Sequence, residues 1–187
     1  MEKADWDGVE SRRAESKRNG KLRGIGLGYF MESSGGKPEE FGRIRMEADG
    51  SATILVGTFS HGQGHGTAFR QIAHDALGLP FEKMNFIDGS DTAIIPRGHG
   101  TGGSRSSQMG GVSILRAAKK VIVKGKVIAA HLLQTGESKV EFASGVYTAT
   151  DSGASITLSE VAIAAHDSDK LPDGMEQGLD ENEHYER

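Results

Sequence analysis

Hydrophobic and polar residues alternate on both sides of the dipeptide Asp49-Gly50. The apolar members of this alternation are Ile44, Met46, Ala48, Ala52, Ile54 and Val56. A period of two is typical of strands with one buried face, and Asp-Gly favours a two-residue turn. Residues 43–57 are therefore predicted to form a β-hairpin that buries one face.

Two longer stretches repeat apolar residues at the spacing of an α-helix. The first contains Phe69, Ile72, Ala73, Ala76 and Leu77. It ends at Gly78 and Pro80, and it can cover the hairpin. The second spans residues 104–133, with an inner face of Met109, Val112, Leu115, Ala118, Ile122, Ala129 and Leu132. Gly125 lies inside this second helix and can bend or divide it.

Shorter elements complete the pattern. Residues 7–18 are predicted to form a helix that Asp5 or Asp7 caps and Gly20 ends. Strands are expected at residues 83–87 and, in a second hairpin around Ser144-Gly145, at residues 139–150. A capping box then starts a short helix, with Thr157 as cap, Glu160 as its partner and apolar residues at 161–165.

The stretch GIGLGYF at residues 24–30 has glycines at alternate positions. A dinucleotide fingerprint needs the spacing G-x-G-x-x-G before a helix, and this stretch lacks it. We expect a strand with a closely packed backbone. The order β-β-β-α-β-α-β-β-α predicts an α+β fold, in which helices pack on a largely antiparallel sheet.

Composition narrows the class of protein. The 187 residues suffice for one domain or two small subdomains. A net charge of −4 without a basic stripe argues against nucleic acid as a partner. The absence of cysteine excludes disulfides, thiolate catalysis and iron–sulfur ligation by this chain. No apolar run suggests a membrane partner or a signal peptide, so a cytoplasmic protein is expected.

Two glycine-rich loops, residues 60–67 and 98–107, each precede a predicted helix. Glycines let backbone N–H groups turn toward a ligand, and a helix start adds partial positive charge. Gln63 offers an amide, while the second loop offers hydroxyls and one guanidinium at a helix start, which suit a diphosphate. The predicted ligand-binding residues are Gly62, Gln63, Gly64, His65, Thr101, Gly102, Gly103, Ser104, Arg105 and Ser106.

Other chemistries fit these loops less well. His61 and His65 lie four residues apart but in a loop, and no further ligand pattern completes a zinc site. No G-x-S-x-G elbow supports a serine nucleophile, and no G-x-x-x-x-G-K-[ST] supports a Walker loop. We therefore predict no metal ligand and no serine nucleophile within the chain.

Three motifs occur in a fixed order: GQGH at residues 62–65, LGLP at 77–80 and GTGGSRSSQMGG at 100–111. Together they resemble the large subunit of the molybdenum hydroxylases, which include aldehyde oxidases, xanthine dehydrogenases and aerobic carbon monoxide dehydrogenases. The resemblance implies a molybdopterin cofactor, in bacteria often its cytosine dinucleotide. It also implies hydroxylation of a carbon centre with water-derived oxygen, or oxidation of carbon monoxide. Gln63 and residues 104–106 would contact the pterin and phosphate portions.

The resemblance further implies that the chain is a fragment of a longer subunit. The general base of the family is a glutamate expected beyond Arg187, so the isolated chain is expected to be inactive and to retain little or no molybdenum. Its partners would be the remaining domains of the large subunit and the iron–sulfur and FAD subunits or domains. The expected division is a helix and linker at 1–23, a molybdopterin-binding subdomain at 24–166 and an acidic connecting segment at 167–187.

Two alternatives remain open from the residues alone. One is an independent module that binds a nucleotide or another phosphorylated ligand. The other is a structural interaction domain whose glycine loops only connect elements. For a fragment of a larger subunit, exposed apolar surface also predicts self-association.

Overall fold

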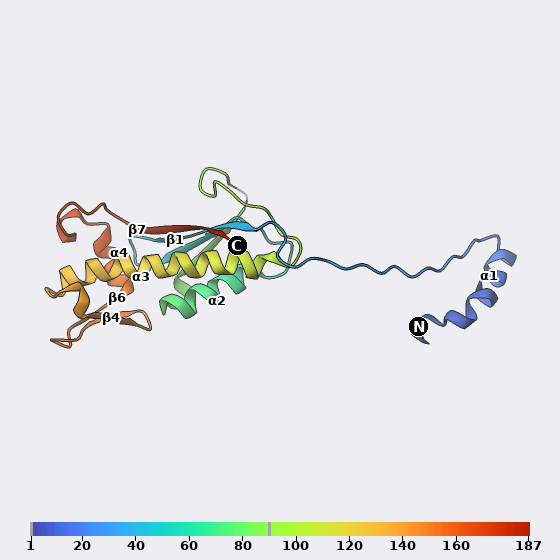
Figure 1. The fold of residues 1–187 in the computed structure, drawn as a ribbon, viewed down its shortest axis with the longest axis horizontal. Helices are drawn as coiled ribbons and strands as arrows, with labels where there is room; N and C mark the ends of the chain where they lie inside the picture. The colour runs from blue at the N-terminus through green and yellow to red at the C-terminus, as the bar shows by residue number, and fades with distance from the viewer. Residues whose placement is uncertain (1, 90) are drawn as a thin grey trace. The chain divides into compact units, whose positions relative to one another are not determined.

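The computed structural model describes residues 2–89 and 91–187 (Figure 1). Its contacts divide the chain into two compact units, Met1–Glu32 and Ser33–Arg187. Within the described residues, no helix is long and apolar enough to cross a membrane. The three-part division expected from the sequence, with a molybdopterin-binding subdomain at residues 24–166, stays a prediction.

The first unit contains one α-helix, α1, at Val9–Arg18. It starts later than predicted because residues Trp6–Gly8 form a separate 3₁₀ turn, which the side chain of Asp5 caps. Beyond α1, Gly20 adopts the left-handed conformation (φ +68°) expected where a helix ends.

The predicted strand at residues 24–30 is wrong for this structure. The stretch has no regular secondary structure, and side chains such as Leu27 (80% exposed) and Tyr29 (92% exposed) face solvent. A Cβ added to Gly24, Gly26 or Gly28 would meet no atom within 4 Å, so the backbone is not closely packed. Alternation gives a strand only when a second strand accepts its backbone hydrogen bonds, and the first unit supplies none among its described residues.

The second unit is built on a four-stranded sheet with the order β3-β2-β1-β7. The strands are β1 (Glu39–Met46), β2 (Ala52–Val56), β3 (Met84–Asp88) and β7 (Leu179–Glu186). β1 pairs antiparallel with β2 and β7, whereas β2 and β3 are parallel. The first predicted hairpin and the α+β class are confirmed.

The hairpin turn lies one residue earlier than predicted. The N–H of Gly50 donates to the carbonyl of Glu47 at 2.9 Å, so Ala48 and Asp49 occupy the turn centre. Gly50 follows with φ +79°. The connection is therefore a turn plus a left-handed glycine, a common three-residue hairpin loop, and Ala48 is exposed instead of buried.

The acidic segment at residues 167–187, which was expected to be a connecting segment, contains the strand β7. β7 pairs with β1 over eight residues, from Glu39 opposite Glu186 to Met46 opposite Leu179. Its acidic side chains find cations on the neighbouring helix: Glu183 lies 2.7 Å from Lys120 and 3.5 Å from Arg116. The strand could not be predicted from the composition of the segment, because the cations that pair with its acidic side chains lie far away in the sequence.

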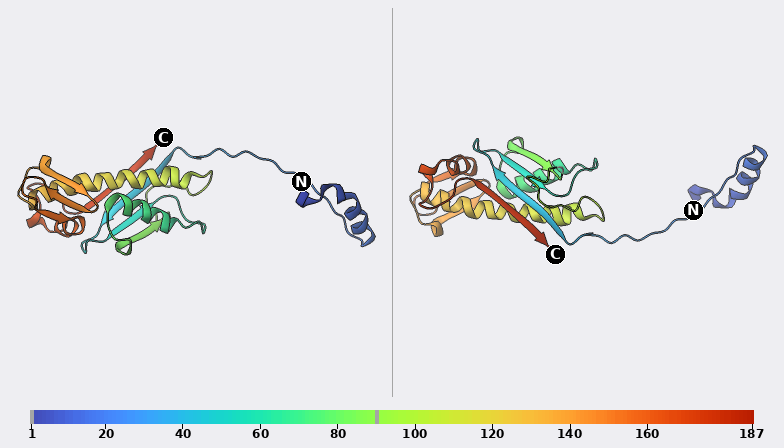
Figure 2. Two further views of the ribbon diagram at one scale, coloured as in Figure 1. Left: turned by 90° about the horizontal axis from the view of Figure 1, so that it is seen from below. Right: turned by 90° about the horizontal axis from the view of Figure 1, so that it is seen from above.

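Helices α2 (His65–Leu77) and α3 (Val112–Leu132) lie side by side and cover one face of the sheet (Figures 1 and 2). Between them and the sheet lies the core, which includes Ile44, Ile54, Phe69, Leu77 and Ile114. The opposite face of the sheet carries a smaller cluster of Phe41, Leu55 and Ile95. β2 is consequently buried on both faces.

The inner face of α3 is partly different from the prediction. Ala118 and Ala129 are buried as expected, but Leu115 is 38% exposed and Ile114 is buried instead. A π-helical turn at Ser106–Gly111 precedes α3. A π turn holds more residues than an α turn. It therefore changes which residues of the following helix α3 face the sheet. α3 also continues unbroken through Gly125.

A second, three-stranded sheet packs at the far end of α3. It consists of β4 (Val140–Ala143), β5 (Val146–Ala149) and β6 (Ser155–Thr157), all antiparallel. Ser144 and Gly145 form the predicted turn, with φ of +48° and +81°. α4 (Leu158–Ala165) begins with the predicted capping box of Thr157 and Glu160.

One ion pair is fully buried in this unit. The guanidinium of Arg105, 2% exposed, donates to the carboxylate of Glu40, 0% exposed. The other oxygen of Glu40 accepts the N–H of Phe41 at 3.0 Å. Arg105 also donates to the carbonyl of Gly100 at 2.9 Å. Removing either partner would leave an uncompensated charge in a dry environment.

Replacing Gly125 by alanine is expected to destabilise the protein, although alanine favours helices by about 1 kcal/mol. An added Cβ would lie 2.2 Å from the hydroxyl oxygen of Tyr147. Overpacking of this kind costs about 1–3 kcal/mol. Urea unfolding should show a lower midpoint for Gly125→Ala, and Tyr147→Phe in the same background should restore part of it. A higher midpoint for the single variant would contradict the close contact.

Glu40→Gln and Arg105→Met should each lower the free energy of unfolding by about 3–5 kcal/mol, because each leaves one buried charge unpaired. The control is Lys139→Gln, which breaks an ion pair with Asp151 in which the lysine side chain is 57% exposed. That change should cost less than about 1 kcal/mol. The double variant Glu40→Gln/Arg105→Met should lose less than the sum of the single losses; an additive result would mean that the two groups do not interact.

Candidate cofactor-binding site

The two glycine loops meet at one groove of about 340 Å³. The first loop joins β2 to α2, and the second lies between β3 and α3. The residues that line the groove are Gln63, His65, Ala68, Thr101, Gly102, Ser104, Arg105, Ser106 and Ser107. Seven of the ten predicted residues are therefore brought together, while Gly62, Gly64 and Gly103 adjoin the lining residues in sequence.

Thr58, which the sequence did not predict as a site residue, links the first loop to the second by hydrogen bonds. Its side chain is 0% exposed, and its Oγ1 lies 2.8 Å from Thr101 Oγ1 and 3.0 Å from Ser106 Oγ. Thr101 in turn donates to the carbonyl of Phe59 at 2.6 Å. Because each hydroxyl has one proton, Thr58 donates to Thr101 and Ser106 donates to Thr58. The hydroxyl protons of Thr101 and Ser106 are thus used inside the protein and are not offered to a diphosphate.

Close backbone contact also places the second loop against the end of β2. A Cβ on Gly98 would lie 2.4 Å from the carbonyl oxygen of Gly57, and a Cβ on Gly57 would lie 2.6 Å from the Cα of Gly98. Only glycine at both positions permits this approach. The loop is therefore held by backbone packing as well as by hydroxyls.

Both helix starts at the groove lack a side-chain cap. The N-cap of α2 is Gly64, with φ +80°, and the N-cap of the π turn before α3 is Arg105. The first N–H groups of a helix have no partner within it, and the helix dipole places partial positive charge there. Ser104 and Ser106, which were expected near this start as hydroxyl donors, make no cap bond to it. Two sets of backbone donors remain for an anion.

The role predicted for Arg105 is wrong. It was expected to offer its guanidinium to a diphosphate, but that group is buried and engaged by Glu40 and by the carbonyls of Gly100 and Glu39. Arg105 therefore supports the loop from behind. Among the described residues, the hydroxyl of Ser104 makes no hydrogen bond to protein; Ser104 itself is exposed at φ +54°.

Gln63 stands between two glycines whose left-handed backbone leaves open space around them. Gly62 has φ +100°, and a Cβ on Gly62 or Gly64 would meet nothing within 4 Å. The amide oxygen of Gln63 accepts the N–H of His61. Its amide nitrogen therefore remains the group that can donate two hydrogen bonds to a ligand.

His65 contributes a buried polar atom that has no hydrogen-bond partner in the described part of the chain. The residue is 4% exposed, its ring packs edge-on against Phe69 at 5.1 Å, and Nδ1 forms no hydrogen bond among the described residues. Burial lowers the pKa of His65 below its ordinary value, more than the nearby charge of Asp88 raises it. The ring is thus neutral near pH 7. A buried polar atom on a groove wall is a position where a ligand atom compensates lost hydration.

A direct metal site does not form from protein side chains in the described part of the chain. There, no three His, Cys, Asp or Glu residues come close enough to hold an ion. The groove instead presents backbone N–H groups, one amide and one neutral imidazole. Those groups suit a heterocycle with an attached phosphate. A metal at this site would have to be bound by the ligand and not by the protein.

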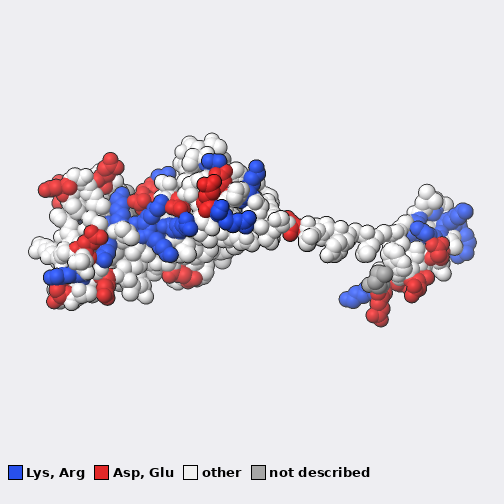
Figure 3. All heavy atoms as spheres, viewed as in Figure 1, with Lys and Arg blue, Asp and Glu red and all other residues white. Residues whose placement is uncertain are grey.

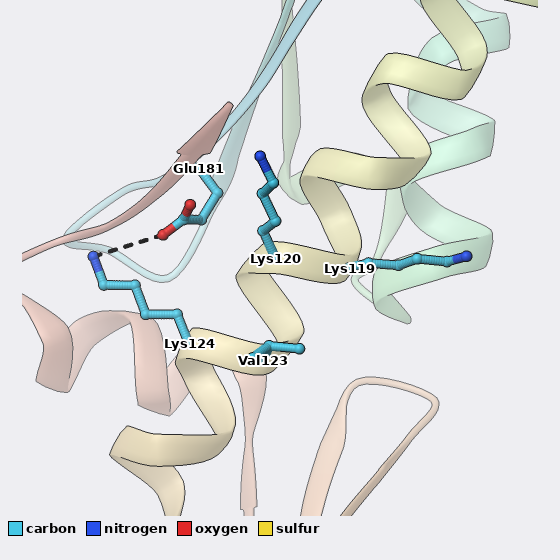
Figure 4. Close-up of a pocket in the computed structure, with 5 residues that line it drawn as sticks. All are labelled: Lys119, Lys120, Val123, Lys124 and Glu181. Carbon is cyan, nitrogen blue, oxygen red and sulfur yellow. Dashed lines mark ion pairs between the residues drawn. The ribbon is translucent and has the colours of Figure 1, made fainter. Parts of the chain in front are cut away.

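A second hollow, of about 390 Å³, lies between α3 and β7 (Figure 4). It is lined by Lys119, Lys120, Val123, Lys124 and Glu181. Lys124 lies 3.9 Å from Glu181. Lysine and arginine gather over this part of α3 (Figure 3), but none of the glycine-loop residues lines the hollow. Its lysines pair with the acidic side chains of β7. The hollow is therefore not part of the candidate site.

The sequence is similar to that of known molybdopterin-binding domains. A family model described as "Molybdopterin cofactor-binding domain" matches residues 1–187. The nicotine 6-hydroxylase large subunit of Paenarthrobacter nicotinovorans is 33% identical over 193 residues, covering 96% of this chain and 24% of the relative. The carbon monoxide dehydrogenase large chain of Afipia carboxidovorans is 33% identical over 208 residues, covering 100% and 25%.

Solved structures show the same similarity. The crystal structure of the Cu,Mo-CO dehydrogenase matches with a TM-score of 0.76 and 29% identity, over 100% of this chain and 25% of that chain. Quinoline 2-oxidoreductase from Pseudomonas putida 86 matches with a TM-score of 0.71 and 29% identity, over 99% and 25%. The chain spans about a quarter of the length of these relatives.

The sequence motifs, the shared groove and these matches agree: the chain belongs to the molybdopterin cofactor-binding domain family found in the large subunits of molybdenum hydroxylases.

Proposed function

We propose that this chain binds the pterin and phosphate portions of a molybdopterin cofactor within a larger molybdenum-containing oxidoreductase. One observation carries the proposal: two uncapped helix starts line a single groove together with His65, whose buried Nδ1 has no hydrogen-bond partner among the described residues. The residues present fit the cofactor, because the groove combines anion-binding backbone with groups that can pair with a heterocycle.

The proposed roles differ between the two loops. Backbone N–H groups at the start of the π turn, together with the free hydroxyl of Ser104, hold phosphate oxygens. Gln63 Nε2 donates to an acceptor on the ligand, and the neutral imidazole of His65 exchanges a hydrogen bond with it through Nδ1. The open backbone at Gly62, Gly64 and Gly102 lets the ligand approach closely. Thr58, Thr101, Gly103, Arg105 and Ser106 keep this surface in shape.

The cofactor, when bound, supplies the redox chemistry that hydroxylates a carbon centre with water-derived oxygen or oxidises carbon monoxide. The relatives are named for nicotine hydroxylation and carbon monoxide oxidation, and this chain matches about a quarter of each. We assign no catalytic group within residues 1–187. The remaining domains of the large subunit and iron–sulfur and FAD partners complete the proposed enzyme, in the cytoplasm.

We further propose the cytosine dinucleotide form of the cofactor. A dinucleotide carries a diphosphate, and the groove offers two helix starts whose partial positive charges can share it. An independent nucleotide-binding module is less well supported, because the similarity extends over the whole chain to subunits about four times as long.

Retention by the isolated chain is expected to be weak. Four hydrogen bonds to charged groups would contribute roughly 6–12 kcal/mol before costs, at about 1.5–3 kcal/mol each. Association and ordering cost about 4–15 kcal/mol. The other walls of the site are therefore needed for tight binding, and the isolated chain should hold little molybdenum.

Gly102→Leu in the molybdenum enzyme that carries this chain tests the proposal. Gly102 lines the groove, its φ lies outside the left-handed range, and a Cβ there meets no atom within 4 Å. The leucine should fill ligand space without disturbing the fold. We expect molybdenum content to fall at least roughly tenfold, which requires a loss of at least about 1.4 kcal/mol of binding free energy, with an unchanged elution volume on gel filtration.

The matched control is Gly136→Leu, at an exposed position with φ −73° where the nearest atom to a Cβ is 3.9 Å away. This variant should retain wild-type molybdenum. Equal molybdenum content in Gly102→Leu and Gly136→Leu, measured by elemental analysis after gel filtration, would contradict cofactor binding in this groove.

A further inference from the structure

Two consecutive glutamates at the start of β1 hold the second glycine loop from both faces of the sheet. Successive side chains of a strand point to opposite faces, so Glu39 and Glu40 point apart. Glu40 reaches the buried Arg105 on one face. On the other face, Glu39 reaches His99 within the same loop and Arg97, the residue just before that loop.

The contacts of Glu39 join three separate parts of the chain. Its Oε1 accepts from a guanidinium nitrogen of Arg97 and lies 2.8 Å from His99 Nε2. Its Oε2 lies 2.8 Å from Nε2 of His184, which comes from β7. The Glu39 side chain is only 15% exposed, although Arg97 is 58% exposed. One carboxylate thus connects the beginning of β1, the loop and the edge strand.

The backbone of Glu39 strengthens this connection. Its carbonyl oxygen accepts from Nη2 of Arg105, and the same nitrogen lies 3.5 Å from the carbonyl oxygen of Lys37. The loop is therefore attached to β1 at residues 97, 99 and 105, on either side of Thr101 and Gly102. Those two residues line the groove. Displacement of the attachment points would move the groove wall with them.

We propose that Glu39 is a positioning residue for the cofactor-binding loop, and that with Glu40 it sets the geometry in which backbone N–H groups meet the ligand. This inference rests on the proposed function of the groove. Glu39 does not touch the ligand; it acts through Arg97 and His99. The partner in binding is the phosphate-bearing portion of the cofactor, because the attached segment ends at the uncapped helix start.

The charge state of Glu39 agrees with this role. Hydrogen bonds from His184 and His99, with the charge of Arg97, lower the pKa of Glu39 from 4.5 to about 2. A carboxylate whose folded pKa is depressed stabilises the fold above its unfolded pKa, and this stability is lost as the pH falls through the folded value. The contribution of Glu39 should therefore be complete above about pH 5 and lost by about pH 2.

Urea unfolding from pH 7 to pH 2 measures this contribution. Glu39→Gln should have a lower midpoint than wild type at pH 7, and the two midpoints should converge as the pH falls from 4.5 toward 2. A difference that does not depend on pH in this range would show that the charge of Glu39 contributes nothing.

Limited trypsin digestion of the molybdenum enzyme that carries this chain reports on the loop itself. We expect Glu39→Gln to increase the cleavage rate after Arg97 several-fold, because the ion pair that restrains this arginine is lost. Cleavage after Lys139, which lies in the other sheet region, serves as the internal reference and should not change. Molybdenum retained after gel filtration should fall several-fold in the same variant.

Glu47→Gln is the matched control. Glu47 lies just beyond the opposite end of β1, where it pairs with Arg45 at 2.9 Å and accepts from Thr53 at 2.6 Å. This variant should show wild-type cleavage after Arg97 and wild-type molybdenum content. If Glu39→Gln also matches wild type in both measurements, the positioning role is wrong.

The results separate this inference from the proposed function. If the groove binds the cofactor but Glu39 does not position the loop, Gly102→Leu loses molybdenum while Glu39→Gln keeps both its molybdenum and its resistance to trypsin. If the groove does not bind the cofactor, Gly102→Leu keeps its molybdenum, and faster cleavage after Arg97 in Glu39→Gln would show only that the loop is held by this carboxylate.

Discussion

The buried ion pair between Glu40 and Arg105 is the contact on which the candidate site depends. Both side chains are removed from water, so each charge needs the other as well as the surrounding hydrogen bonds from Phe41 and to Gly100. A buried charge tolerates few alternative geometries, because each would leave it unpaired. The second loop is thereby held in one position at the start of β1, close to the first loop.

The groove that results is formed by backbone more than by charged side chains. Its one arginine faces inward, and the hydroxyl protons of Thr101 and Ser106 are used to join the two loops. What remains at the groove is the start of two helices, the amide of Gln63 and the buried, neutral imidazole of His65. Backbone donors keep their positions without side-chain entropy to lose, which suits a large ligand that must be held in one orientation.

Electrostatics also explains the edge of the sheet. α3 carries lysines and an arginine along one side, and β7 places Glu181 and Glu183 opposite them. Arg116 additionally stacks over the ring of Tyr185 at 4.5 Å. An acidic segment that would be extended and solvated alone becomes an ordered strand beside these cations. His184 on the same strand then reaches Glu39, so the edge strand and the groove are mechanically connected.

Local pattern by itself determined the hairpin at β1 and β2, helix α2 with its glycine end, the Ser144-Gly145 turn and the capping box of α4. In each of these, the signal and the structure it specifies lie within a few residues of one another. The two glycine loops, and seven of the nine residues that line the groove, could also be predicted, because glycine spacing and family motifs are visible in the sequence.

The remaining features, which are β7, the irregular stretch at residues 24–30 and the roles of Arg105 and Thr58, were decided by tertiary structure. Each of them depends on partners that are distant in the sequence. β7 became a strand only beside β1 and α3, whereas residues 24–30 have the alternation of a strand but no neighbouring strand among the described residues of their unit. Arg105 faces Glu40, 65 residues away, instead of a ligand. Thr58 carries no motif, and its role arises because two loops cross at its side chain. A sequence names the groups that can interact, and only the folded chain decides which of them are already satisfied.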